Sequence, residues 1–441
     1  MKSRSAPTPA PTLGLIGCCA LVVGNMIGSG VFLLPASLAP YGWSAIGGWV
    51  ITILGTLCLA ACFSGLSRAF PRAGGPYVYV EAAFGRSAAF VIAWSYWIGI
   101  WVGNAALAVA VMSNLSALVP AIGTVPGLGA GLAVALMALL CALNLTGART
   151  GGIVAAVTTV LKLLPLLAVL VIAAVLLARD GAAAVVTPPG GVTGGGVITC
   201  VTLTLWAMLG FESATLPADK VRNPDRIVPI ATLGGTAATG LIYLLISAAM
   251  LALVPAGSLA ASNAPFADFV RPFVGDAAAG MIALFAAIAA LGAMNGWIMI
   301  SGEMPRAMAI GGVFPAFFAA VNSRAVPARA TIVSAGLSGL LVLANYTRSL
   351  VSLFEFIILI STVAMLFAYV AVALAVLKLR LQARSDTVPI GGRWLGGIAV
   401  LALAYAGFAI YAAGQEALGW GALLLLAGVP VLVVMQRGSN P

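Results

Sequence analysis

The sequence predicts an all-α integral membrane protein with about twelve transmembrane helices, and three observations support this fold class. Of the 441 residues, 62% are hydrophobic and only 7% are charged, whereas soluble domains are about half apolar and about a quarter charged. Apolar runs of roughly 20 residues, long enough to cross a bilayer as a helix, recur along the chain. The basic residues gather in alternate loops. This composition excludes a soluble enzyme and a nucleic-acid-binding protein, despite a net charge of +10.

Twelve apolar segments fit the length of a transmembrane helix. The first follows Lys2 and Arg4, as a signal peptide does, but it is too long and lacks a small-residue cleavage site, so we expect no cleavage. Residues 1–11 are rich in Ser, Pro and Thr and are expected to form a disordered cytoplasmic leader. The predicted spans are 14–38, 42–66, 87–113, 127–147, 152–178, 196–216, 229–254, 277–301, 330–346, 354–378, 394–413 and 417–436.

The basic residues predict the orientation of these spans. With the N-terminus inside, 17 of the 21 Lys and Arg residues fall on the cytoplasmic side and 3 fall outside, while Lys162 lies within a span. Such an excess on one side follows the positive-inside rule. We therefore expect a multi-pass protein of the cell (inner) membrane with both termini in the cytoplasm. The positive charge reports this orientation, and no nucleic-acid partner is expected.

Several kinds of chemistry are excluded by residues that the chain lacks or buries. There is no histidine, which removes histidine acid–base catalysis, histidine metal ligands and a Ser-His-Asp triad. The six cysteines sit inside apolar runs, as small buried hydrophobes do, and indicate neither disulfides nor a metal site. No nucleotide-binding loop is present. We therefore expect no cofactor and no metal, and disfavour a membrane enzyme or an ion channel.

Spans 1 and 6 are interrupted at comparable places. Span 1 carries the run GNMIGSG at 24–30, and span 6 carries WAMLGFES at 206–213. Glycine weakens a helix by about 1 kcal/mol relative to alanine, and unwound backbone at membrane depth is tolerated where it faces protein or a watery cavity. Breaks in the first span of each of two five-span units are typical of inverted-repeat transporters. The alternative, that these glycines only permit close helix packing, stays open.

Three further side chains lie where a membrane helix does not need them. Trp206 and Trp297 are deep within spans rather than at the interfaces, and an indole face can hold a cation by about 2 kcal/mol when dry. Glu212 is an acid at membrane depth, where ionisable residues are functional by default. Simple packing of the tryptophans, and a purely structural carboxylate, remain the alternatives.

Lys162 places an ammonium among apolar neighbours, about ten residues into the fifth predicted span. A charge near the bilayer centre costs at least about 3 kcal/mol. We expect the ammonium to point inward and donate to carbonyls freed by the break at 24–30, as a fixed substitute for a coupling cation. The alternative is that it snorkels to the interface.

Three regions of the chain carry a family resemblance. The run GSGVFLLP at 28–35 resembles the first broken helix of the amino acid–polyamine–organocation superfamily. The run FPRAGGPYVY at 70–79, followed by Phe-Gly at 84–85, resembles the loop after its second span. The segments LWAMLGFESA at 205–214 and NPDRIVPIAT at 223–232 are similar to span 6 and its loop in the basic amino acid/polyamine antiporter family, nearest the arginine/agmatine antiporters.

The resemblance implies an architecture and an activity. It implies a five-plus-five inverted repeat, with the first repeat at 12–178 and the second at 196–378, followed by two C-terminal helices at 394–436. It also implies a homodimer that exchanges an amino acid for its decarboxylated amine, and so a small-molecule substrate in a lipid bilayer.

The resemblance also implies roles for individual residues. Ser29 and Gly30 would hold the carboxylate and α-amino group of the substrate, and Asn104 would meet its distal polar head. Trp206 and Trp297 would stack on the substrate. The complete set of substrate-binding positions is Ile27, Ser29, Gly30, Tyr96 (as an aromatic gate), Ile100, Asn104, Leu107, Trp206, Leu209 and Trp297, with Glu212 and Lys162 as coupling or pH-sensing residues.

Four positions depart from the arginine/agmatine pattern. Ile100 replaces a small polar or sulfur-containing residue, and Leu107 replaces a methionine. Val363 stands where a serine is expected, although Ser361 is close by. Lys162 replaces an apolar residue and is more similar to proton-coupled or sodium-independent amino-acid transporters of the superfamily. The alternative function is therefore a proton-linked transporter or exporter of neutral amino acids.

Overall fold

The computed structural model describes residues 14–71, 74–146, 161–186, 191–215, 221–382 and 391–438, and the regular structure of these residues is helical. The first half of the chain forms α1 (Leu15–Met26), α2 (Gly30–Leu38), η1 (Ala39–Tyr41), α3 (Ser44–Ala69), α4 (Pro76–Phe84), α5 (Arg86–Leu115), α6 (Ala121–Thr124), α7 (Leu128–Asn144), α9 (Leu163–Asp180) and η2 (Gly181–Ala184). The second half forms α10 (Gly194–Met208), η3 (Phe211–Thr215), α11 (Pro224–Leu253), α12 (Ala256–Ala260), α13 (Pro265–Ile310), η5 (Ala316–Ala319), α14 (Ala328–Ala344), α15 (Leu350–Gln382), α16 (Leu395–Ala412), α17 (Gly414–Leu426) and α18 (Val429–Gly438).

The helices confirm the predicted fold class. Within the described residues, ten helical segments are long and apolar enough to cross a membrane, and the shorter apolar helices α7 and α14 bring the total to twelve. Each of the twelve overlaps one of the predicted spans. The chain is therefore a multi-pass α-helical membrane protein. That its two five-span units form an inverted repeat stays a prediction.

One predicted span is only partly described, and another is longer in the structure than predicted. The predicted span 152–178 corresponds to α9, which begins only at Leu163, and residues 152–160 lie outside the described residues. Lys162 therefore lies just before the first turn of α9 rather than deep inside a described helix. The span predicted at 277–301 belongs to the longer α13, which contains a kink at Gly275 with φ 79°. Apolar periodicity continues through such a kink and gives no sign of it.

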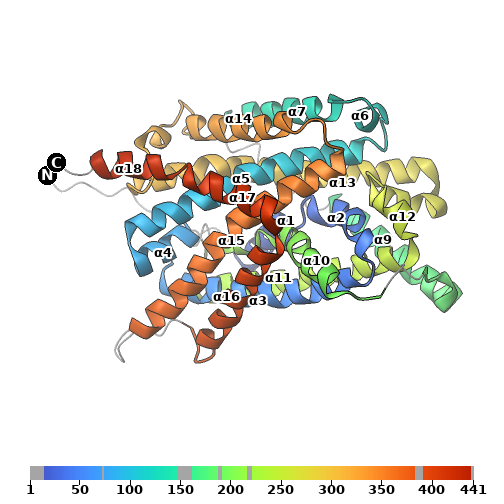
Figure 1. Ribbon diagram of the computed structural model, residues 1–441, viewed down its shortest axis with the longest axis horizontal. Helices are drawn as coiled ribbons and strands as arrows, with labels where there is room; N and C mark the ends of the chain where they lie inside the picture. The colour runs from blue at the N-terminus through green and yellow to red at the C-terminus, as the bar shows by residue number, and fades with distance from the viewer. Residues whose placement is uncertain are drawn as a thin grey trace.

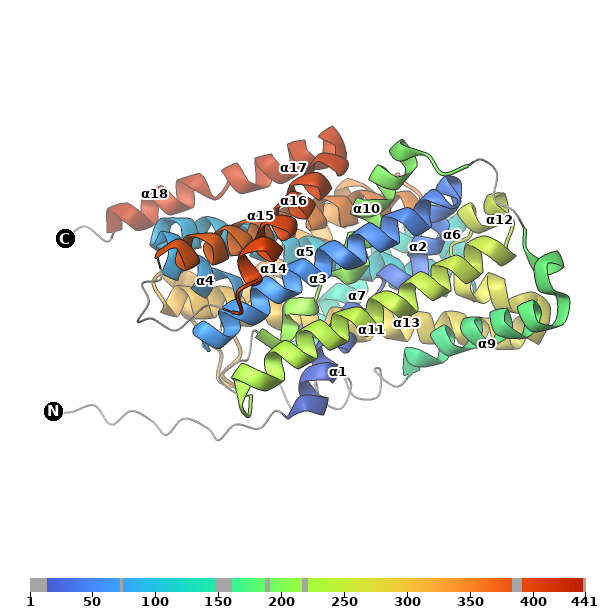
Figure 2. The same ribbon diagram turned by 90° about the horizontal axis from the view of Figure 1, so that it is seen from below.

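The long helices run side by side along the long axis of the molecule (Figure 1). Helix α5 lies at the centre, with 94% of its most apolar stretch buried, and it packs against α13 and α15. A helix that is apolar on all sides is expected in such a position. Helix α4 lies at one end of the bundle, and α6 and α12 lie at the other (Figures 1 and 2).

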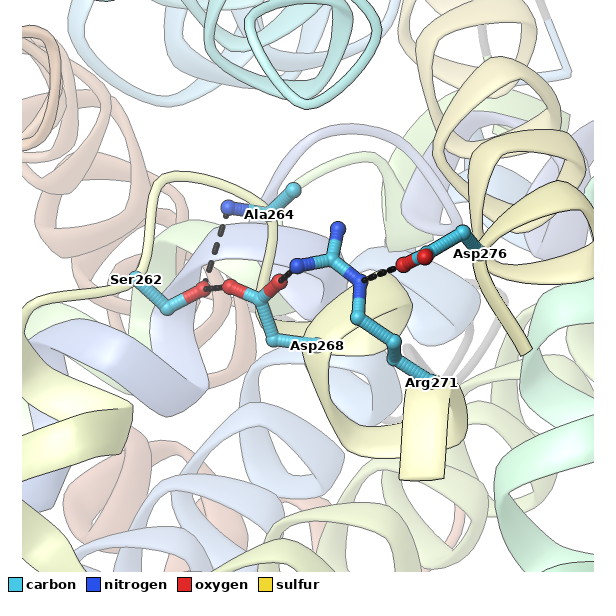
Figure 3. A network of polar contacts seen from close by, with 5 residues as sticks. All are labelled: Ser262, Ala264, Asp268, Arg271 and Asp276. Atoms are coloured by element: carbon cyan, nitrogen blue, oxygen red, sulfur yellow. Dashed lines mark hydrogen bonds and ion pairs between the residues drawn. The ribbon is translucent and has the colours of Figure 1, made fainter. Parts of the chain in front are cut away.

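A polar network holds the corner between α12 and α13. Arg271 lies 3.3 Å from a carboxylate oxygen of Asp268 and 3.3 Å from one of Asp276, so it joins two acids on either side of the kink at Gly275 (Figure 3). The hydroxyl of Ser262 donates to Asp268 over 2.5 Å and accepts from the backbone N–H of Ala264 over 3.1 Å. These contacts fix the turn that leads into α13.

Candidate substrate site

Both predicted breaks are present, and they lie against each other. Helix α1 ends at Met26 and α2 begins at Gly30, while α10 ends at Met208 and η3 begins at Phe211. The amide of Asn25 donates to the hydroxyl of Ser213 over 2.8 Å, and this hydroxyl donates to the carbonyl of Gly210 over 2.6 Å. One polar chain therefore links the two breaks through the middle of the bundle.

Glycine is required at two positions of this junction. Gly210 has φ +102°, a conformation that strains other residues, and a Cβ there would lie 3.1 Å from the carbonyl carbon of Asn25. A Cβ on Gly30 would lie only 2.7 Å from that of Ala207. These glycines therefore permit close helix packing and also lie at the breaks. The two explanations that the sequence left open are compatible.

A small cavity lies between the breaks and helices α5, α13 and α15. Its volume is about 40 Å³, measured as the space open to the centre of a water molecule. This is room for a few waters, so an amino acid needs movement of the walls to enter. The described residues that line it are all neutral: Asn25, Met26, Gly28, Ser29, Gly30, Gly99, Ile100, Gly103, Leu107, Trp206, Ala207, Leu209, Trp297, Ser361 and Met365.

Seven of the ten candidate substrate-binding residues line this cavity: Ser29, Gly30, Ile100, Leu107, Trp206, Leu209 and Trp297. Both tryptophans thus face the same small space from different helices, α10 and α13. The hydroxyl oxygen of Ser29 is buried and has no hydrogen-bond partner among the described residues. A substrate group at this wall of the cavity would therefore find a free polar atom.

The other three candidates do not line the cavity in this structure, and their roles in substrate binding stay predictions. Ile27 lies in the break of span 1 and is fully buried. Asn104 follows the cavity-lining Gly103 by one residue, a rotation of about 100° around the helix, and its side-chain oxygen is buried without a partner among the described residues. Tyr96 is fully buried and donates its hydroxyl to Glu212 over 2.7 Å. In this structure Tyr96 is a hydrogen-bond partner of the acid, and its role as a gate stays a prediction.

Several lining residues were not predicted, and two glycines could have indicated them. Gly99 and Gly103 are one turn apart on α5, where a Cβ would lie 2.8 Å from Met365 and 3.0 Å from Trp206 respectively. Small residues at this spacing let another helix approach, and here they admit α15 and the indole. Ser361 of α15 donates to the carbonyl of Gly99 over 2.7 Å. The remaining unpredicted residues are Asn25, Met26, Gly28 and Ala207.

Glu212 is buried beside the cavity and does not line it. One carboxylate oxygen accepts hydrogen bonds from the hydroxyls of Tyr96, at 2.7 Å, and Tyr369, at 2.9 Å. The other oxygen accepts from the backbone N–H of Gly210 over 3.2 Å. Three hydrogen bonds thus satisfy both oxygens of the buried carboxyl group. The acid is thereby tied to the break of span 6.

Lys162 makes the contact that the sequence predicts. Its ammonium donates to the carbonyl oxygens of Gly24, at 2.5 Å, and Ile27, at 3.2 Å, and the residue is 4% exposed. The hydroxyl of Tyr243 donates over 2.7 Å to the carbonyl of Met26, which lies between Gly24 and Ile27 in the sequence. Two side chains thus satisfy three carbonyls at the break of span 1, as buried backbone at membrane depth requires.

Two discontinuous helices that meet at a cavity inside a helical membrane bundle define a secondary transporter. The chain belongs to the amino acid permease family, whose model matches residues 13–433. Membership confirms the resemblance found in the sequence and the expectation of a transport protein rather than an enzyme.

Characterised relatives cover most of the chain. It is 32% identical over 331 residues to the cadaverine/lysine antiporter of Escherichia coli K12, a match that covers 74% of this chain and 73% of the relative. It is 29% identical over 421 residues to the putrescine transporter PotE of Haemophilus influenzae, covering 94% and 95%. PotE of Escherichia coli K12 is 27% identical over 418 residues, covering 94% of each chain.

Proposed function

We propose that the protein exchanges a cationic amino acid for its decarboxylated amine across the inner membrane by alternating access. The carrying observation is that Trp206 and Trp297 both line a cavity whose wall, as far as the described residues form it, holds no charged side chain. An ammonium or guanidinium can lie over an indole face without a buried counter-charge. The names of the relatives, a cadaverine/lysine antiporter and putrescine transporters, support the same class of substrate.

The substrate's α-carboxylate and α-amino group would bind at the two breaks. The free hydroxyl of Ser29 and the backbone where α2 begins at Gly30 lie at one side of the cavity. The N-terminus of a helix such as α2 attracts a carboxylate. An amine product lacks this carboxylate, so amino acid and amine would share the indoles and differ at the breaks.

Arginine with agmatine is the specific pair that we propose, on the resemblance around span 6. Lysine with cadaverine is the pair named for one relative, and both pairs fit the same arrangement of groups. Proteoliposomes loaded with agmatine, cadaverine or no amine should therefore be tested for uptake of labelled arginine and lysine. Uptake that requires an internal amine supports exchange, whereas equal uptake into empty liposomes contradicts it.

A second candidate function is proton-linked transport or export of neutral amino acids. Lys162 favours it, because its ammonium lies on the carbonyl of Ile27, next to the lining residues Met26 and Gly28. A fixed positive charge there disfavours a second cation nearby. Leucine and alanine in the same liposome assay, driven by a pH gradient, separate the two functions. Leucine uptake without arginine uptake would support the second and overturn the first.

The oligomeric state and the orientation are further proposals. We propose a homodimer, which cross-linking of the full chain in native membranes tests. We also propose that both termini are cytoplasmic, which follows from the distribution of basic residues. Accessibility of a C-terminal tag to protease in inside-out vesicles checks it, and protection there would reverse the topology.

A further inference from the structure

A second hollow lies on the outside of the bundle, away from the candidate substrate site. Helices α7 and α14 pack against each other at one edge of the molecule (Figure 1). Between them is a groove of about 550 Å³. Small and larger apolar residues from both helices line it: Val134, Ala138, Cys141, Ala142, Leu145, Ile332, Ala335, Gly336, Gly339, Leu340 and Leu343.

The length of this groove matches one leaflet of a bilayer. Its lining runs from Val134 to Leu145 on α7 and from Ile332 to Leu343 on α14. Eleven helical steps cover about 17 Å, and half of the hydrocarbon core is about 15 Å thick. The groove is apolar throughout this length, so a single acyl chain has the right chemistry and the right extent to fill it.

Two arginines stand at one end of the groove. Arg329 precedes Ile332 by one turn on α14, so it continues the groove face toward the end of that helix. Arg324 donates to the carbonyl of Thr146, the residue after the lining residue Leu145, over 3.3 Å. The helices are antiparallel here, so both arginines flank the same end.

The charge of these arginines is not neutralised within the described part of the chain. Among the ion pairs of the described residues, Glu303 of the neighbouring α13 pairs with Arg306 at 3.6 Å, and neither Arg324 nor Arg329 has an acidic partner. Arg329 instead lies 5.0 Å from the centre of the Phe317 ring. Both side chains are exposed. Arginine pairs readily with phosphate, and basic residues at the membrane surface attract anionic lipids.

We propose that the groove between α7 and α14 binds one anionic phospholipid, with an acyl chain between the helices and the phosphate on Arg324 and Arg329. The charge at the groove's end selects this occupant over a neutral lipid. The groove is about 17 Å long and apolar along this whole length, which suits a single acyl chain. The site is separate from the transport cavity, and its test does not depend on the transported substrate.

The test is native mass spectrometry of the full-chain protein titrated with phosphatidylglycerol or with phosphatidylcholine of the same acyl chains. Arg324→Gln/Arg329→Gln should weaken phosphatidylglycerol binding about thirtyfold, toward the affinity for phosphatidylcholine, since each basic group contributes about 1 kcal/mol near an anionic lipid. The matched control is Lys378→Gln/Arg393→Gln. It removes the same charge from two residues that also lie over aromatic rings, and it should bind as the wild type does.

A second pair of variants tests the acyl chain. A Cβ on Gly336 would meet no atom within 4 Å, so Gly336→Leu fills the groove without a clash at that position. It should weaken binding of both lipids at least about tenfold. Ala142→Leu fills the groove from the opposite wall and guards against misfolding of the first variant. The control is Gly234→Leu on α11, where a Cβ also meets open space.

Two outcomes overturn the proposal. One is phosphatidylglycerol binding that is unchanged in the charge variant and in both filled variants. The other is a filled groove that converts a dimer to a monomer without changing lipid binding, which would assign the groove to a second copy of the chain.

Discussion

The amide nitrogen of Asn25 lies 2.8 Å from the hydroxyl oxygen of Ser213, and this contact joins the break of span 1 to the break of span 6. The two residues are far apart in sequence. Asn25 is the last residue but one of α1, and Ser213 lies in η3, the short helix that follows α10. The hydroxyl also donates to Gly210, whose backbone N–H donates to Glu212. A conformational change at one break would therefore disturb the hydrogen bonds of the other break and of the buried acid.

The first prediction concerns this link. Asn25→Ala should leave the hydroxyl of Ser213 without its donor and reduce exchange several-fold, because a buried hydrogen bond contributes about 1 kcal/mol. A double-mutant cycle with Ser213→Ala measures the coupling. We expect the double variant to be little worse than either single variant. Losses that simply add would mean that the two breaks work independently.

The second prediction concerns the indole of Trp297. Trp297→Leu should weaken binding of arginine or agmatine by up to about thirtyfold, because cation–π attraction is worth up to about 2 kcal/mol when water is excluded. Trp297→Phe keeps an aromatic face and should retain part of the affinity. Isothermal titration calorimetry of the purified variants measures both. If Trp297→Leu binds like the wild type, stacking is not the source of affinity.

The third prediction concerns the pH dependence of transport. Glu212→Gln removes the group that can gain and lose a proton but keeps an amide that can accept from Tyr96 and Tyr369. Exchange should therefore become nearly independent of pH between about pH 5 and 8. Uptake into proteoliposomes over this range checks it, with Glu303→Gln as a control acid near a helix end. A curve for Glu212→Gln that overlays the wild type would remove Glu212 from coupling.

The fourth prediction concerns Lys162. Lys162→Ala leaves the carbonyls of Gly24 and Ile27 unsatisfied, and should impair transport strongly while lowering the melting temperature moderately, since each orphaned polar group costs about 1–3 kcal/mol. Tyr243→Phe is the matched control, because it removes one hydrogen bond from the same break without removing a charge. We also expect no sodium dependence in the wild type. Sodium-driven uptake, or full activity in Lys162→Ala, would contradict the proposed role.

The sequence was sufficient for the features that depend on local composition. Each predicted apolar run overlaps an apolar helix of the structure, and both breaks lie where glycine and polar residues interrupt those runs. The inward contact of Lys162 also followed, because an ammonium inside a membrane must find acceptors. These inferences depend only on the lipid environment and on the chemistry of the residues themselves.

Features that depend on how helices rotate against one another were not predictable in the same way. Asn104 and Gly103 are neighbours in sequence, yet only Gly103 lines the cavity. Tyr96 lies on the same helix and faces Glu212 instead. A shift of one residue turns a side chain by about 100°, and the packing of α13 and α15 on α5 decides which direction is the cavity. The groove between α7 and α14 was not predictable for the same reason, because it is lined by small residues of two separate helices and depends on how these helices pack.

The corner between α12 and α13 makes that face of the protein responsive to dissolved salt. Arg271 is shared by Asp268 and Asp276, and the Asp276 side chain is 93% exposed. Exposed charges are screened over about 8 Å at physiological ionic strength and over shorter distances in brine. The hydrogen bond from Ser262 to Asp268 keeps its partner at contact distance and is less affected. Concentrated salt would thus weaken the ion pair between Arg271 and Asp276 first. At low ionic strength both ion pairs of Arg271 would hold the corner in place.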